Sequence, residues 1–522
     1  MIILRRILEE RWLLYIGLFG LAVGLPLSRS FVSIAPGVLI GAWVFDGFYR
    51  KDFRLKWKSF LGSKVALSLA GLFILYLAWS LFSDNDSKAL KLVIDKLPLL
   101  LLPLSLSGLE IPHRKAIDKL FSLHIAAILV STALSYVNWK INGSTGTIRD
   151  SLLFVNHIRL SLMMVLSISL LFLRWSNNWN VRLFFKLSIV LWFLFFMYEF
   201  QLVTGFSLAL IVVVLLIVRG LRSGRALRWS ALGILLILSA GIILVVPLIK
   251  LQFDKPEISS NILLEKTLED RTYYSIPDNL QTQNGNYVWH YIQLEELKRE
   301  WNLRSSRKLA NDEGLGSLFI GRIIRYMTSK DLRKDAEGVK SLSAKDIQNI
   351  ENGWTSVKEE EYSGLQKRIA ELLFEIDSYL NGGNPSLSSL TVKFEYWKTG
   401  WRILQNNMLT GVGVGDVRDE FNLEFEKGTQ LSRKAWDKTH NQYLTWAITF
   451  GVFGALLALI LFVAPGFFGQ APFRFQILLL YLVFLTSFVM EDTLETQLGL
   501  NLFLFYIGML VMPSIYLKPL YR

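Results

Sequence analysis

The five histidines are the first residues to consider for chemistry, because an imidazole can take up or release a proton near neutral pH. They are His113, His124, His157, His290 and His440. No two of them have the spacing of zinc ligands and no His-Glu-x-x-His motif occurs, so the sequence predicts no metal site. The lack of cysteine excludes disulfides, iron–sulfur clusters and thiolate catalysis.

His440 and Asn441 stand where a polar segment enters a long apolar run. Two interpretations are open at this point. The pair can form a polar cap at a membrane interface, with Tyr443 as an anchor. Alternatively, His440 can act as a general base or hydrogen-bond donor at the outer bilayer surface.

Arg159 is a charged residue inside an apolar segment, 152–173, and follows Asn156 and His157. It is about seven residues into this segment, or ~10 Å at 1.5 Å per helical residue. A charge at the centre of a span costs roughly 2.5–3.5 kcal/mol, so Arg159 is expected either to snorkel to the interface or to face a cavity. In a cavity, its planar guanidinium suits pyrophosphate, because it forms paired hydrogen bonds.

Three further cations, Lys393, Lys398 and Arg402, lie on a predicted helix at 390–405. Such charges are ordinary on a surface helix. The glycine-rich stretch 411–415 follows. It is not a Walker A loop, because no Gly-Lys-Ser/Thr comes after it, and we expect a tight turn there.

These residues are embedded in an unusually apolar chain, which is 52% hydrophobic and only 19% charged. A soluble domain usually has about 25% charged residues. Runs of about 18 or more apolar residues can span a bilayer. The sequence therefore predicts an all-α polytopic membrane protein with about twelve transmembrane helices, at 12–28, 31–48, 64–82, 90–108, 118–138, 152–173, 183–200, 202–219, 229–249, 442–465, 473–490 and 497–516. The fourth contains Asp95, Pro98 and Pro103, so we expect it to be broken or partly interfacial.

The orientation follows from the connecting loops, since Lys and Arg accumulate on the cytoplasmic side. Alternate loops are basic, and the others are poorer in Lys and Arg or acidic, such as 491–495. Arg5 and Arg6 precede the first apolar run without a convincing cleavage site, so we expect an uncleaved first span. Both termini are then cytoplasmic.

This topology divides the chain into three parts: transmembrane helices at 1–249, a large external loop at 250–440, and transmembrane helices at 441–522. Within the loop, helices are expected at 287–303 and 364–380, besides the one already described. The loop holds 27 Lys/Arg and 29 Asp/Glu, so the excess of positive charge belongs to the membrane part. A nucleic-acid partner is excluded, because it would require a basic soluble face.

Taken together, the spans, the loop and three stretches of sequence resemble the O-antigen ligase family of bacterial membrane glycosyltransferases, in particular its Bacteroidota-type members. The first stretch runs from the aromatic segment 393–397 (KFEYW) to the glycine turn. The second is the re-entry 440–444 (HNQYL) with 451–454 (GVFG). The third, 325–335 (RYMTSKDLRKD), is similar to one in that subgroup. The resemblance covers about residues 150–465.

The resemblance implies roles for individual residues. The family's histidine corresponds to His440, with Asn441 beside it, and its arginine ahead of the aromatic helix corresponds to Lys393. The arginine early in the family's eighth span is absent at 202–206. Arg159, with neighbouring His157, is the candidate substitute, and Arg402 is a further candidate for the donor pyrophosphate.

The resemblance also implies a GT-C-like fold and a function. The chain would move a glycan from undecaprenyl pyrophosphate to an acceptor hydroxyl, as in O-antigen ligation to lipid A–core during lipopolysaccharide biosynthesis. This transfer is inverting and independent of metal and cofactor, and it faces the periplasm at the inner membrane. One alternative is an O-antigen or exopolysaccharide polymerase with the same donor. Another, of a different class, is a polysaccharide flippase or transporter, which would favour inverted repeats and broken midplane helices.

The predicted orientation can be tested with reporter fusions after Arg225 and after Asn352. The first position lies in a basic loop and the second in the large external loop, so a phosphatase fusion should be active only at the second. A cytoplasmic reporter should show the opposite pattern. The same signal from both positions would contradict the topology.

Overall fold

The computed structural model describes residues 12–108, 114–143, 147–174, 179–221, 245–255, 265–362, 364–468 and 474–511. By packing, the chain forms two units, Met1–Leu216 with Lys393–Arg522, and Ile217–Val392. The predicted parts 1–249, 250–440 and 441–522 concern sides of a membrane. Packing does not test sidedness, so those boundaries stay a prediction.

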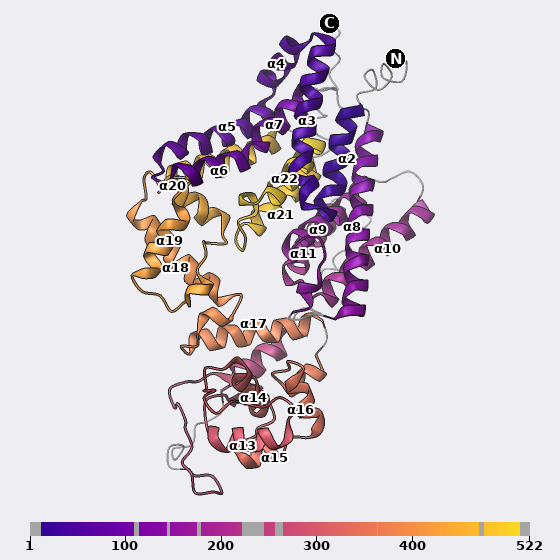
Figure 1. The fold of residues 1–522 in the computed structure, drawn as a ribbon. Helices are drawn as coiled ribbons and strands as arrows, with labels where there is room; N and C mark the ends of the chain where they lie inside the picture. Colours follow the sequence, from indigo (N-terminus) through magenta and orange to yellow (C-terminus); the bar gives the residue numbers. More distant parts are fainter. Residues whose placement is uncertain are drawn as a thin grey trace. The chain divides into compact units, whose positions relative to one another are not determined.

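The first unit is built from helices (Figure 1). Those before the large loop are α2 (Trp12–Leu27), α3 (Arg29–Arg50), α4 (Phe53–Gly62), α5 (Lys64–Trp79), α6 (Asp86–Lys96), α7 (Pro98–Gly108), α8 (Arg114–Asn142), α9 (His157–Arg174), α10 (Trp179–Glu199) and α11 (Val203–Leu221). Those after it are α18 (Thr391–Asn406), α19 (Val417–Glu426), α20 (Gln442–Phe467), α21 (Arg474–Ser487) and α22 (Gln497–Leu510). Short 3-10 helices are η1 (Ser80–Phe82), η2 (Ile148–Ser151), η5 (Arg433–Ala435) and η7 (Thr493–Glu495).

Several of these helices are apolar enough for a membrane. By length and composition, four in the described residues can span one: Arg29–Arg50, Lys64–Phe82, Ala116–Asn142 and Gln442–Phe467. Shorter apolar helices are Leu13–Leu27, His157–Leu171, Val203–Leu216, Arg474–Ser487 and Gln497–Leu510. The chain is thus a helical membrane protein, while the count of about twelve spans stays a prediction. Most of the ninth predicted span, and Arg5 and Arg6, lie outside the described residues.

Two spans differ in detail from simple helices. The fourth is broken as expected: α6 ends at Lys96, and Pro98, which cannot donate a backbone hydrogen bond, begins α7. The sixth begins at His157 rather than at 152, because Asn156 precedes the helix and its Oδ1 accepts a hydrogen bond from Arg159 N at 3.0 Å. Arg159 therefore lies in the first turn of α9 rather than seven residues into a helix, and its depth in a membrane stays a prediction.

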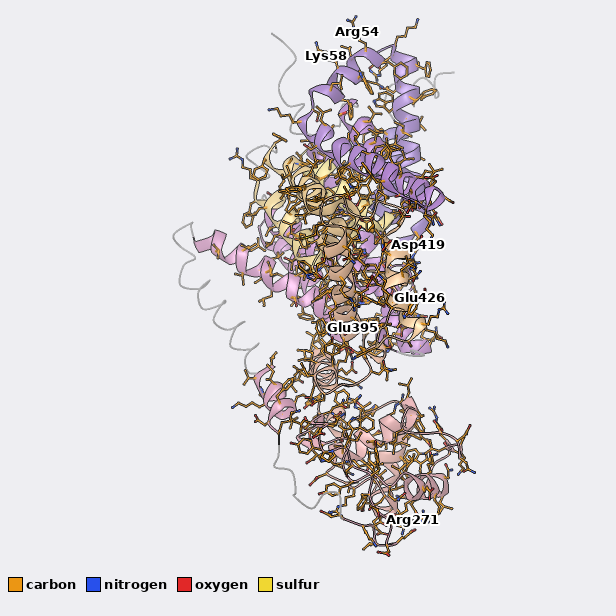
Figure 2. All side chains as sticks on the ribbon, turned by 90° about the vertical axis from the view of Figure 1, so that its left-hand side faces the viewer. Arg54, Lys58, Arg271, Glu395, Asp419 and Glu426 are labelled. Carbon is orange, nitrogen blue, oxygen red and sulfur yellow. The ribbon has the colours of Figure 1, made fainter. Side chains whose placement is uncertain are left out.

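The short helix α4 separates its charges by exposure. Arg54 and Lys58 are exposed (Figure 2). Lys56 is buried, and its Nζ lies 2.6 Å from Asp46 Oδ2. Trp57 on the exposed face is 51% accessible. This mixture of aromatic and basic residues is typical of a helix that lies along a membrane surface.

The long helix α20 opens at Gly451, where φ is 70° and ψ is 175°. This interruption frees backbone groups, and the predicted glycine turn supplies their partners. Val412 N donates to Ile448 O at 2.9 Å, and Val452 N donates to Met408 O at 2.8 Å. The turn itself is confirmed, and it joins α18 to the middle of α20.

Glycine is required on both sides of this junction. Gly411 and Gly413 have φ of 68° and 90°, the left-handed region that glycine adopts readily. A Cβ on Gly451 would lie 2.2 Å from Leu409 O, and one on Gly411 would lie 2.4 Å from Thr449 O. The backbones therefore approach too closely for any side chain.

The second unit, residues 217–392, has its own hydrophobic core, with Trp301, Tyr326 and Met327 fully buried. Its elements are β1 (Thr282–Gln283), β2 (Asn286–Tyr287), α13 (Leu294–Arg304), α14 (Leu318–Ser329), α15 (Ala336–Lys340), α16 (Ala344–Glu351), η3 (Val357–Glu360), α17 (Leu365–Leu380) and η4 (Pro385–Leu387). The two strands pair antiparallel.

The helices expected in the loop agree with the structure except at one boundary. The helix predicted at 364–380 is α17, and that predicted at 390–405 is α18. The one predicted at 287–303 begins only at Leu294. Its first residues are extended, because Tyr287 belongs to β2 and Ile292 bridges to Tyr274.

We expect Gly451→Ala to destabilise the protein, because the new methyl group meets Leu409 O and the positive φ is strained for alanine. A strained backbone position of this kind costs about 1–3 kcal/mol. Thermal unfolding of the purified protein in detergent measures the effect. Gly41→Ala in α3 is the matched control, since no heavy atom lies within 4 Å of the position that its methyl group would take. Equal melting temperatures for the two variants would contradict the prediction.

Candidate functional site

The connection between α21 and α22 carries three carboxylates within five residues, namely Glu491, Asp492 and Glu495. We call residues 491–495 the acidic loop. All three side chains are largely buried, with exposures of 12%, 5% and 8%. Buried carboxylates require cations or hydrogen-bond donors around them, and each of the three recruits a different partner.

Glu495 is paired with Lys96 at the end of α6. Lys96 Nζ lies 2.7 Å from Glu495 Oε2 and also donates to Leu494 O at 2.6 Å. On its other oxygen, Glu495 accepts from Tyr76 OH at 2.6 Å and from Gln442 Nε2 at 2.8 Å. The carboxylate thus joins α5, α6 and the first residue of α20.

The same contacts decide the charge of Glu495. Burial raises the pKa of its carboxyl, but the ammonium groups of Lys96 and Lys438 and the donated hydrogen bonds outweigh burial and lower it to about 2. Glu495 is therefore ionised at neutral pH. The loop is held by a charge-assisted network that gains stability from the ionised form.

Glu491 brings together two cations that the sequence singled out separately. Arg159 Nη1 lies 3.6 Å from Glu491 Oε2, and Lys393 Nζ lies 3.3 Å from Glu491 Oε1. Lys393 also donates to Met490 O at 2.7 Å. The first turn of α9 and the start of α18 therefore meet at one carboxylate.

Arg159 is only 3% exposed, yet its hydrogen bonding is incomplete. Its Nη2 donates to Thr496 Oγ1 at 3.4 Å, while Nε and Nη1 have no hydrogen-bond partner among the described residues. The 3.6 Å to Glu491 is longer than a hydrogen bond. Buried donors without acceptors are rare and costly, so this guanidinium keeps unused donors that an anionic ligand would satisfy.

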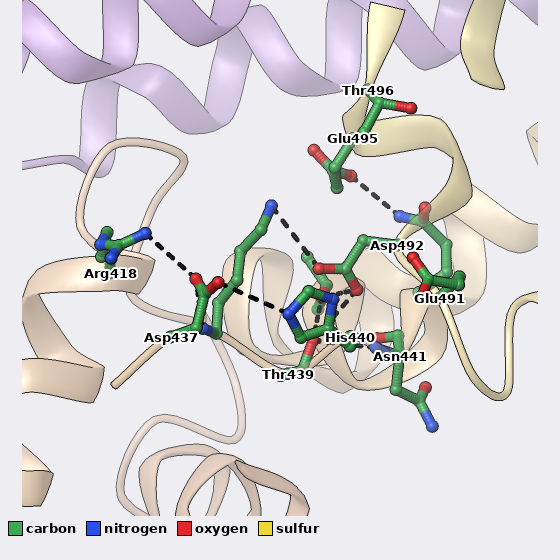
Figure 3. Close-up of polar contacts among 12 residues, drawn as sticks. Arg418, Asp437, Thr439, His440, Asn441, Glu491, Asp492, Glu495 and Thr496 are labelled. Atoms are coloured by element: carbon green, nitrogen blue, oxygen red, sulfur yellow. Dashed lines mark hydrogen bonds and ion pairs between the residues drawn. The ribbon is translucent and has the colours of Figure 1, made fainter. Parts of the chain in front are cut away.

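Asp492 connects the acidic loop to the segment before α20. Its Oδ1 accepts from Thr445 Oγ1 at 2.9 Å and from Thr439 Oγ1 at 3.2 Å. Lys438 Nζ lies 3.5 Å from its Oδ2. These contacts place residues 438–440 directly beside the acidic loop (Figure 3).

His440 is held by neighbours on both sides. Its Nε2 lies 3.5 Å from Asp437 Oδ2, and Asp437 Oδ1 pairs with Arg418 Nη1 at 3.0 Å (Figure 3). The imidazole ring packs against Tyr396, with centroids 5.8 Å apart. The hydrogen bond from His440 lowers the pKa of Asp437, which keeps this carboxyl ionised.

The backbone turns sharply at His440, where φ is 47°. Asn441 then caps α20, since its Oδ1 accepts a hydrogen bond from Leu444 N at 3.0 Å. Asn441 is therefore the N-cap residue of α20, while the interfacial position expected for this pair stays a prediction. His440 stays half-buried, and its Nδ1 has no hydrogen-bond partner in the part of the chain that the structure describes.

The other two proposed site residues, Arg402 and His157, have hydrogen bonds within their own helices. Arg402 on α18 is exposed, and its Nη2 donates to Thr399 Oγ1 at 3.2 Å. His157 begins α9, and its carbonyl accepts from Ser161 Oγ at 2.8 Å. Lys398 pairs with Glu395, three residues earlier on the same helix, at 3.0 Å.

The acidic loop and Asp437 are the residues that sequence reasoning missed. In the sequence, the loop served only as a marker of orientation. Its density of carboxylates between two apolar spans was a visible signal that cations must be nearby. Asp437 lies three residues before His440 without a helix to make the spacing meaningful, so no pattern pointed to it.

Comparison with known families agrees with this part of the chain. Residues 348–459 match a family model described as O-antigen ligase. The matched segment includes Lys393, Arg402, His440 and Asn441, whereas Arg159 and the acidic loop lie outside it. The resemblance is thereby confirmed over this segment. No curated protein was found to match the sequence.

The match supports a glycosyltransferase-like enzyme of the O-antigen ligase or polymerase type, with lipid-linked glycans as its general class of substrate. The match concerns the amino-acid sequence of residues 348–459, whereas the contacts around Glu491 are a property of the folded chain. The geometry of the cluster and the family match are therefore two independent observations.

We expect Lys96→Met to destabilise the protein at neutral pH by about 3–5 kcal/mol, because it leaves the buried Glu495 carboxylate without its cation. In the wild type, the folded pKa of Glu495 lies below its ordinary value of 4.5. Its stabilisation is thus present above about pH 4.5 and is lost as the pH falls toward 2. Lys96→Met should lack this pH dependence, which thermal unfolding at pH 7 and pH 3 measures.

The matched control is Lys88→Met, on the same helix. Lys88 pairs with Asp419 at 2.6 Å, but both side chains are exposed, and such surface pairs contribute about 0–1 kcal/mol. The double variant Lys96→Met/Glu495→Gln should regain most of the stability. A melting temperature for Lys96→Met equal to that of Lys88→Met would contradict the role of the buried pair.

Proposed function

Taking the O-antigen ligase match as the premise, we propose that this chain transfers a glycan from undecaprenyl pyrophosphate to an acceptor hydroxyl. The preferred reaction is ligation of O-antigen to lipid A–core at the periplasmic face of the inner membrane. The observation that carries the proposal is the buried guanidinium of Arg159, which has donors without acceptors and shares Glu491 with Lys393.

The donor's pyrophosphate is assigned to Arg159 and Lys393. In the ligand-free protein, Glu491 is their shared counterion. A pyrophosphate carries more charge and more acceptor oxygens than a carboxylate, and a guanidinium binds such oxygens in pairs. Donor binding is then an exchange, in which pyrophosphate oxygens replace Glu491 at Arg159. Arg402 and His157 remain candidates for contacts further along the donor.

The acceptor hydroxyl is assigned to His440. A neutral imidazole that donates its Nε2–H to Asp437 keeps Nδ1 as an acceptor, and Nδ1 has no partner in the described residues. It can then take the proton of the attacking hydroxyl. The N-terminus of α20 lies immediately beyond Asn441, and its N–H groups add positive potential next to the leaving pyrophosphate.

The proposed step breaks one bond and forms one. The acceptor oxygen attacks the anomeric carbon of the donor sugar from the face opposite the pyrophosphate, which inverts that carbon. The C–O bond between the sugar and the phosphate breaks, and undecaprenyl pyrophosphate leaves while Arg159 and Lys393 stabilise its charge. The proton of the acceptor hydroxyl moves to His440. Positioning and charge stabilisation supply the catalysis, and the step requires no metal.

We expect His440→Ala to lower turnover by roughly 10²–10⁴-fold while donor binding persists, which is the usual range for loss of a general base. The assay contains purified full-length protein, lipid-linked glycan, lipid A–core acceptor and a chelator. Lys434→Ala, an exposed neighbour outside the cluster, is the control. Wild-type turnover in His440→Ala would assign the histidine to the interface alone, and loss of wild-type transfer in chelator would contradict the metal-free step.

The same assay, together with a measurement of donor affinity, tests the proposed role of Arg159 in donor binding. Arg159→Lys should lose most of its activity through weaker donor binding, because an ammonium cannot reproduce the paired hydrogen bonds of the guanidinium. Unchanged donor affinity in this variant would remove Arg159 from the site. If the product is lengthened glycan on the lipid carrier rather than glycan on lipid A, the enzyme is the alternative polymerase.

A further inference from the structure

A separate hollow, partly open to solvent, lies within the second unit. It is bordered by the helical residues 245–253, the turn after β1, α14 and the first turns of α17. No residue of the cluster around Glu491 lines it, so it requires an explanation of its own.

The most distinctive lining residue is Arg325 of α14. Its Nε donates to Gln283 Oε1 at 3.0 Å, and its guanidinium carbon lies 3.4 Å from the centre of the Phe374 ring. The stacked ring and the single hydrogen bond fix the plane of the guanidinium. Its two Nη groups have no hydrogen-bond partner among the residues that the structure describes, so four N–H donors are available.

Two buried amides complete the polar lining. Gln252 and Gln283 are 6% and 7% exposed. The Gln252 nitrogen donates to Thr282 O at 2.7 Å and to Asp377 Oδ2 at 3.0 Å, while its carbonyl has no partner in the described ranges. The side-chain carbonyl of Gln283 accepts the hydrogen bond from Arg325, and its side-chain nitrogen has no hydrogen-bond partner among the described residues. Buried amides normally satisfy both groups, so the hollow offers an acceptor and a donor to a ligand.

The charges of the lining cancel, which restricts the class of ligand. Lys367 Nζ lies 2.5 Å from Glu359 Oε2. Glu371 is paired with Arg368 at 3.0 Å. With Arg325 and Lys367 balanced by Glu359 and Glu371, the lining has no net charge to attract a free anion. It favours a neutral ligand with many groups that both donate and accept.

We propose that this hollow binds a saccharide unit. A sugar hydroxyl both donates and accepts, which matches the unused groups of Arg325, Gln252 and Gln283. The C–H faces of a sugar ring can pack against Leu251 and Tyr362, which also line the hollow. That the saccharide belongs to the glycan handled by the enzyme rests on the proposed function, but binding itself does not depend on His440.

The test measures binding to the full-length protein in lipid nanodiscs by saturation-transfer NMR. The probes are oligosaccharides released by mild acid from the lipid-linked glycan and from the lipopolysaccharide core of the source strain. Wild type should bind at least one of the two pools, and the pool that binds identifies a donor-side or an acceptor-side role. Arg325→Met and Gln283→Leu should each weaken binding roughly tenfold or more, because each removes hydrogen bonds in a buried site.

Arg322→Met is the matched control, since Arg322 lies one turn earlier on α14 and does not line the hollow. Equal melting temperatures would show that the variants fold. A wild-type protein that binds saccharide through Arg325 and Gln283 but transfers none leaves this proposal standing without the proposed function. Failure of wild type to bind either pool, equal binding by Gln283→Leu, or displacement of the saccharide by inorganic phosphate would overturn it.

Discussion

Neutralisation of the acidic loop is the interaction on which the site depends. Three carboxylates within five residues are buried between two apolar helices, and none can remain there alone. Cations from separate parts of the chain pair with these carboxylates, namely Lys96, Lys438, Arg159 and Lys393. Residues nearly 400 positions apart are therefore fixed relative to one another by charge.

The acidic loop also explains why the two proposed halves of the site are adjacent. Glu491 orients the cations, and Asp492 orients the segment that ends in His440. Because these carboxylates are consecutive, a displacement of one shifts the other. An anion that displaces Glu491 would thus also shift Asp492 and its hydrogen bonds to Thr439 and Thr445. Under the proposed function, donor binding and acceptor positioning would be linked through two neighbouring peptide units.

The sequence predicted the broad fold well, because hydropathy and helical periodicity are properties of local stretches. The apolar helices, the break before Pro98, α17 and the glycine turn all followed from such stretches. The errors occurred where an apolar stretch was not helical. Residues 152–155 are apolar but precede the Asn156 cap, and Tyr287 belongs to a strand that only a distant partner explains.

At the candidate site, the type of a residue could be used to predict its importance, but the contacts between residues could not be predicted from the sequence. His440, Arg159 and Lys393 stood out because charged or titratable groups near a membrane require a reason. Glu491, Asp437 and Lys96 did not, since their importance lies in contacts with residues far along the chain. Such contacts leave no spacing in a single sequence. The hollow beside Arg325 is hidden for the same reason, because its lining is drawn from several separate segments.

The opening of α20 at Gly451 has a consequence for the biogenesis of the protein. In the bilayer, a backbone group without a partner costs several kcal/mol, so a helix entering alone keeps its own hydrogen bonds. The partners of the opened turn, residues 408–413, belong to the chain made just before α20. The kink can thus form only when that earlier segment returns to the inserted helix. We therefore expect α20 to insert into the membrane first. The kink at Gly451, in the half of α20 nearest His440, then forms in a later step.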